Sequence, residues 1–100
     1  MHIIDKVYFS DNIKHPKRIL RRFRRNKLIP GIFVLRQAYG NDQLEIIKAD
    51  YFKQKFLRNE PLSIIGFAAD YDDAVDLSLK IVSEAYETTG VPDVKKFLSL

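Results

Sequence analysis

LSIIGFAAD, residues 62–70, is the stretch that decides the fold. Its first eight residues are apolar on both alternating faces, whereas a strand with one solvated face alternates apolar and polar side chains. We therefore expect a strand that is buried on both sides and lies near the middle of a sheet. Asp70 then favours the start of a helix, because its side chain can accept a hydrogen bond from a first-turn backbone N–H.

The residues after this strand predict a long helix from Tyr71 to about Thr89. Asp72 and Asp73 suit the positive end of the helix dipole, and Gly90 suits the position just after the last turn. The apolar arc of the helix is broad. Such a helix should be buried, either over the open face of the sheet or against a second copy. The arc comprises Ala74, Val75, Ser78, Leu79, Ile81, Val82, Ala85 and Tyr86.

Local signals place the remaining elements before and after this strand–helix unit. They predict a strand over 3–10, a basic helix over about 16–26, a β-hairpin over about 31–49 with a turn at 40–42, a short helix over 50–58, and a short tail over 92–100. The order matches a ferredoxin-like βαββαβ sheet with an additional long helix. We therefore expect an α+β (or α/β) fold in a single domain, 1–100.

The most unusual segment is KHPKRILRRFRRNK, residues 14–27, in which eight of the fourteen residues are Lys or Arg and none is acidic. At roughly 100° per residue, Ile19, Leu20 and Phe23 fall on one side of the predicted helix. The basic residues fill the opposite side. We call this surface the basic face, and it comprises Lys14, Lys17, Arg18, Arg21, Arg22, Arg24 and Arg25.

The basic face has several interpretations. It is the solvated side of an ordinary helix, or it binds an anion. Arg18–Arg22 and Arg21–Arg25 are like-charge pairs four residues apart, each costing a few tenths of a kcal/mol, so we expect a compensating anion. Arginine in preference to lysine favours planar contacts with phosphate or carboxylate.

Three compensating partners are open. The first is RNA or DNA phosphate. The second is an acidic surface of this protein, met within the chain or across a homodimer, which the long helix supplies. The third is another anionic partner. The acidic residues concerned are Asp73, Asp76, Glu84 and Glu87.

Composition narrows the class of protein. The 100 residues are 46% hydrophobic and contain no cysteine, which fits a folded domain in the reducing cytoplasm and excludes disulfides and thiolate metal sites. The apolar runs 28–35 and 62–69 are much shorter than the roughly 20 residues that span a bilayer. The N-terminus has no signal-peptide pattern. We therefore expect a soluble protein with no membrane partner.

No catalytic, cofactor or metal site is predicted. Asp42, Glu45 and Lys48 form a loose nuclease-like set, but strand alternation points Glu45 and Lys48 to opposite faces. His2 and His15 lack partners for a triad, and the four glycines are dispersed. A small hydrolase without a recognisable motif is the remote alternative to a binding protein.

Two family resemblances bear on these expectations. VYFSDN (7–12) on a first strand is similar to the RNA-recognition motif, in which Tyr8 would stack on a base. QLEIIKA lacks the basic-Gly-aromatic pattern of that family's third strand, so Tyr8 is expected in the core or at an edge.

The second resemblance rests on IKHPKR, PGIFVL, NDQLEI and IIGFAADYDDAVDLSLKIVSEAYETTG. Together these segments resemble a family of small uncharacterised proteins of Clostridia-type bacteria. The resemblance spans about residues 6–98 and implies a bacterial cytoplasmic protein. It implies no activity, cofactor or partner.

Overall fold

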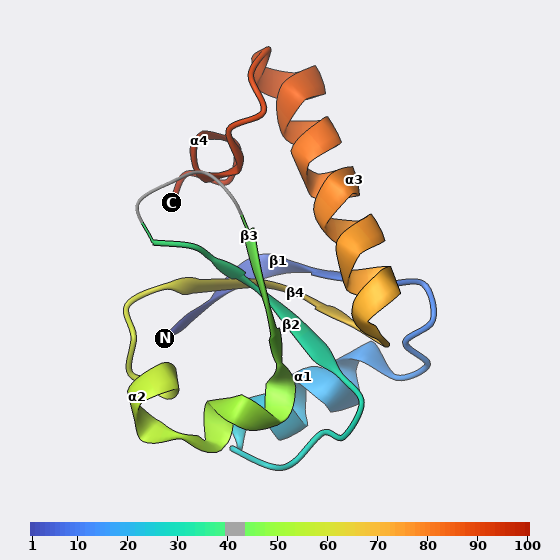
Figure 1. Ribbon diagram of the computed structural model, residues 1–100, viewed down its shortest axis with the longest axis vertical. Helices are drawn as coiled ribbons and strands as arrows, with labels where there is room; N and C mark the ends of the chain where they lie inside the picture. The colour runs from blue at the N-terminus through green and yellow to red at the C-terminus, as the bar shows by residue number, and fades with distance from the viewer. Residues whose placement is uncertain (40–43) are drawn as a thin grey trace.

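A computed structural model describes residues 1–39 and 44–100 of the chain. These residues form a four-stranded mixed sheet in the order β1-β4-β2-β3, covered by helices (Figure 1). In chain order the elements are β1 (His2–Phe9), α1 (Pro16–Arg24), β2 (Phe33–Gln37), β3 (Leu44–Lys48), the 3₁₀ helix η1 (Ala49–Lys53), α2 (Lys55–Arg58), β4 (Ser63–Ala68), α3 (Tyr71–Thr89) and α4 (Val94–Phe97).

β4 is an interior strand, and all of its six residues are buried. It pairs in parallel with β1 and antiparallel with β2. Ile64 and Phe67 belong to the core on one side of the sheet, and Ile65 and Ala68 belong to the core on the other. The apolar residues on both alternating faces of this stretch therefore determine a three-layer arrangement.

The strand order differs from the ferredoxin-like order that the succession of elements predicts. A ferredoxin-like sheet places its first strand in the interior and both helices on one face. In this chain β1 is an edge strand and β4 is an interior one, whereas α1 and the η1–α2 segment do lie on one face of the sheet, with α3 on the other (Figure 1). The interior position suits β4 because its side chains are apolar on both faces. The ferredoxin-like order is therefore corrected to β1-β4-β2-β3, and the coarser prediction of an α+β fold is confirmed.

Two local boundaries also differ from the expected ones. The helix expected over 50–58 is split into η1 and α2, because Gln54 adopts an extended conformation with ψ 127°. The basic helix ends at Arg24 because Asn26 has φ 58°. The hairpin pairs Phe33 with Lys48 and Gln37 with Leu44. The turn expected at 40–42 lies outside the described residues.

Both ends of α3 are capped by local interactions. The Asp70 side chain accepts a hydrogen bond of 2.8 Å from the backbone N–H of Asp73. Gly90 follows the helix with φ 81°, a left-handed conformation that favours glycine. The buried side chains of α3 are Ala74, Leu77, Ile81 and Ala85, which pack against the sheet face opposite α1. This helix therefore covers the second face of the sheet within the chain.

Candidate functional site

The apolar side of α1 is held against the sheet by Phe23, which is 2% exposed. The Phe23 ring meets Phe67 of β4 edge-on, with 5.1 Å between centroids, and Phe52 of η1, with 5.4 Å. Such edge-to-face pairs add to the stabilisation from burial. Ile19 and Leu20 are half-buried in the same cluster. These contacts set the rotation of α1 about its axis, so that the opposite side faces solvent.

The C-terminal end of α1 is fixed by two sets of hydrogen bonds. The N–H groups of Asn26 and Lys27 donate to the carbonyl oxygens of Phe23 and Arg22, the pattern of a helix stop with a left-handed residue. Arg58 of α2 donates to the Phe23 carbonyl oxygen at 3.1 Å, and its guanidinium lies 5.3 Å from the centre of the Phe23 ring. The orientation of α1 is therefore specified at its last turn as well as along its buried side.

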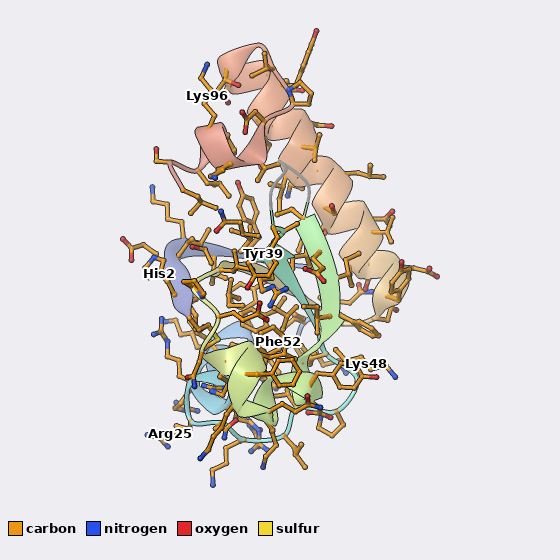
Figure 2. All side chains as sticks on the ribbon, turned by 60° about the vertical axis from the view of Figure 1, so that its left-hand side comes forward. His2, Arg25, Tyr39, Lys48, Phe52 and Lys96 are labelled. Carbon is orange, nitrogen blue, oxygen red and sulfur yellow. The ribbon has the colours of Figure 1, made fainter. Side chains whose placement is uncertain are left out.

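Figure 2 shows nitrogen-ended side chains gathered around Arg25 at one end of the molecule, with Lys96 at the other end. The residues of the basic face are exposed, except Arg22, which is half-buried. Arg22 donates to the Leu28 carbonyl oxygen at 2.9 Å and so helps to hold the segment after α1. The structure thus brings the predicted residues together on one surface and gives Arg22 a structural contact that helical spacing does not indicate.

The basic face has no carboxylate partner among residues 1–39 and 44–100. Within these ranges, the ion pairs of 4 Å or less are those of Arg36 with Glu45 and with Glu60. α3, which carries the acidic residues named above, packs on the other face of the sheet. Among the described residues the basic face makes no ion pair with α3, and the contact near the start of α1 is a hydrogen bond of 2.6 Å that the Asn12 amide donates to Asp73.

The two main helices differ in the electrostatics of their first turns. α3 begins with a capping Asp70 and with Asp72 and Asp73. α1 begins with Lys17 and Arg18 and has no acidic residue in its first turn, and the side chain at its N-cap makes no capping hydrogen bond. Cations near a helix N-terminus oppose the helix dipole. Lys17 and Arg18 therefore oppose the dipole of α1, whereas the cations of its last turn, Arg21, Arg22 and Arg24, favour it.

We predict that Arg18→Glu stabilises the free protein by about 0.5 kcal/mol at low salt. The new carboxylate would favour the N-terminal end of α1 and pair with Arg22 one turn later. Urea unfolding measures the change. Asp72→Lys, the matched reversal in the first turn of α3, should destabilise by a similar amount. A loss of stability in Arg18→Glu would instead mean that the positive charge at this position supports the fold.

Two depressions adjoin the basic face. The first, the apolar groove, has a volume of about 330 Å³ and lies between α1 and the segment 28–32. Its apolar lining comprises Ile13, Ile19, Leu28, Ile29, Pro30 and Ile32. The second, the basic depression, is lined by Lys14, His15, Pro16, Lys17, Arg18 and Arg21. Lys14, His15 and Arg18 line both, so the two depressions form one continuous surface.

The wall of the apolar groove is anchored to the rest of the protein. The backbone N–H of Ile29 donates to Asp50 Oδ1 at 2.8 Å, and the backbone N–H of Ala49 donates to the Ile32 carbonyl oxygen at 2.9 Å. Together with the bond from Arg22 to Leu28, these contacts fix both ends of the segment 28–32. The groove is therefore formed without a ligand. No local pattern in the sequence indicates this groove, because it is formed by contacts between residues far apart in the chain.

A second polar cluster surrounds Arg36 of β2, which is 4% exposed. Its guanidinium donates to Glu45 at 2.7 Å and to Glu60 at 3.0 Å, and the Tyr39 hydroxyl also donates to Glu60. Glu45 is thus committed to an ion pair, and Asp42 of the nuclease-like set lies outside the described residues. The cluster ties the connection before β4 to the hairpin. In the sequence, this cluster is indicated only by the position of Arg36, which directly follows the apolar residues Phe33, Val34 and Leu35 of β2.

The hydrogen bond from Tyr39 and, after it, the interactions with Arg36 hold the pKa of Glu60 below its ordinary value of 4.5, against the opposing effect of burial. A carboxylate whose pKa is depressed by folding stabilises the folded state above its unfolded pKa. This contribution is lost as the pH falls through the folded pKa. The Arg36 cluster should therefore support the fold at neutral pH and fail in acid.

We predict that Glu60→Gln is destabilised relative to the wild type at pH 7. The difference should shrink as the pH falls from 4.5 through the lower folded pKa of Glu60, where the wild-type carboxylate is protonated too. Chemical denaturation across this pH range measures it. Glu87→Gln, at an exposed site on α3, is the control and should be neutral. A pH-independent difference for Glu60→Gln would contradict the role of its charge.

Of the other candidate residues, His15 lies beside the basic face, where it lines both depressions. Tyr8 is half-buried among side chains of the α3 layer, and burial followed by the charge of Glu84 raises its pKa. α3 and α4 cover this face of the sheet, so Tyr8 is not presented to a base as in the RNA-recognition motif. Neither a metal-holding group of three or more His, Asp or Glu side chains nor a helix suited to crossing a membrane occurs among the described residues.

No protein-family model, curated protein or solved structure matches this chain. The resemblance to small proteins of Clostridia-type bacteria therefore stays a prediction.

Proposed function

We propose that this protein is a binding domain that holds an anionic partner, nucleic acid in first place, on the basic face of α1. The observation that carries the proposal is the unneutralised charge of that face. Seven basic side chains share one surface, and within residues 1–39 and 44–100 none of them has a carboxylate within 4 Å. Lys17 and Arg18 also oppose the dipole of α1. A phosphate backbone would neutralise them.

Nucleic acid is preferred over other anions because of the side chains and their arrangement. Five of the seven residues are arginines, whose planar guanidinium groups suit phosphate oxygens. They follow a nine-residue helix, so the charge is extended along a line of roughly 13 Å. A linear polyanion can meet several of these groups at once and release counterions. We therefore expect binding dominated by backbone contacts and steeply weakened by salt.

Charge reversal tests this proposal. In Arg18→Glu/Arg21→Glu/Arg25→Glu, affinity for RNA or DNA should fall by about a hundredfold or more at low salt, because attraction becomes repulsion. Arg22 is left intact because it holds Leu28. Fluorescence anisotropy measures the affinity, and circular dichroism checks that the triple variant folds.

The matched control reverses three exposed lysines on the other helices. Lys80→Glu/Lys95→Glu/Lys96→Glu changes the net charge by the same amount, on α3 and α4. This control should keep most of the affinity. Equal losses in both triple variants would mean that only net charge matters, and the basic face would not be the binding surface.

A homodimer is the second candidate, and the outer side of α3 favours it. Tyr71, Leu79 and Tyr86 are 55%, 61% and 59% exposed and fall within about 80° of arc. A second copy could cover them, and the acidic side of its α3 could meet the basic face between copies. Light scattering at tens of micromolar should then give a molar mass of two chains for the wild type. The Leu79→Asp variant should have the molar mass of a single chain. A wild-type protein of single-chain mass would exclude this candidate.

A further inference from the structure

The apolar groove adds a second kind of contact to the basic face. Backbone contacts to phosphate need only cations, and the basic depression supplies them. The groove is instead lined by aliphatic side chains and joins the depression at Lys14, His15 and Arg18. Leu28 in its wall is 48% exposed and is therefore accessible to a ligand. An occupant must therefore combine an apolar body with a negative charge next to it.

The groove has the size of a small-ligand site, and it is already formed in the free protein. Both properties suit a nucleobase. A volume of about 330 Å³ is at the lower end of small-ligand sites, which run from roughly 300 to 1,000 Å³. Its wall is held by the hydrogen bonds of Ile29 and Ile32 described above. Within a strand, a nucleobase presents flat apolar faces, and the sugar that bears it is linked to a phosphate on either side. Paired bases in a duplex are stacked and cannot enter such a groove, whereas bases of a single strand can be splayed out.

We infer that the groove receives an unpaired base of single-stranded RNA or DNA while neighbouring phosphates lie on Lys14 and Arg18. The inference rests on the proposed function and narrows it from nucleic acid to single strands. The apolar part of the lining consists of isoleucine, leucine, proline and alanine, and polar side chains complete the groove: Asn12, Lys14, His15, Arg18 and Arg22. Contact with the apolar part requires a base and does not by itself distinguish one base from another.

Truncation of the groove wall tests the inference. Leu28→Ala should weaken binding of a short single strand by about fivefold or more, because contact between a base and an apolar surface is lost. Binding of the same strand annealed to its complement should change by less than about twofold, because its contacts are to phosphate. Leu79→Ala, at an equally exposed leucine of α3, should leave both affinities unchanged.

Two further experiments distinguish contacts to the base from contacts to the phosphates. A single strand of abasic sites keeps the phosphates, so wild type and Leu28→Ala should bind it equally. In nuclear magnetic resonance spectra, the methyl groups of Ile13, Leu28 and Ile32 should shift on adding the normal strand, through the ring current of the base, and stay in place with the abasic strand. This readout uses the wild-type protein and does not depend on a variant folding.

The outcomes distinguish the two claims. If Leu28→Ala binds the normal strand as the wild type does while the charge-reversed triple variant does not, the groove inference is wrong and the proposed function stands. Binding of the wild type to neither strand nor duplex would overturn both. Methyl shifts with an acidic, leucine-containing peptide and none with the single strand would also overturn the inference, because the groove would then serve a protein partner.

Discussion

The burial of Phe23 between Phe67 and Phe52 is the contact on which the site depends. It joins α1 to the central strand and to η1, and it sets which side of α1 faces the sheet. Ile19 and Leu20 follow Phe23 inward, so helical geometry sends the basic residues outward together. Arg58 reinforces this placement by binding the Phe23 carbonyl oxygen and covering its ring. The position of the basic face is therefore set by contacts in the core.

The arginines of this chain have three kinds of surroundings, which differ in the partner that the guanidinium group meets. Arg36 is buried and meets two carboxylates. Arg58 binds backbone carbonyl oxygens at the end of a helix. Arg21 and Arg25 are exposed and have no acidic neighbour within ion-pair distance in the described ranges. The arginines that support the fold have partners, and the ones on α1 without a partner are those for which we propose an external anion.

The sequence predicts those features of the structure that depend on residues close together in the chain. The spacing of Ile19, Leu20 and Phe23 indicates the two sides of α1, and the apolar run ending at Asp70 indicates an interior strand followed by a helix. The strand order depends instead on how two apolar clusters pack on the two faces of one sheet. No single segment of the sequence determines that packing. The apolar groove and the contact of Arg36 with Glu60 join residues far apart in the chain. For that reason the sequence predicted the charges of the site and missed its apolar part.

The central claim is that several cations of the basic face neutralise phosphates together. The dependence of single-strand affinity on salt concentration tests it most directly. About three phosphates on a helix of roughly 13 Å predict that the logarithm of the association constant falls against the logarithm of salt concentration with a slope of about −2 or steeper. A slope near zero, or a slope unchanged when Arg18, Arg21 and Arg25 are replaced by glutamine, would contradict the account.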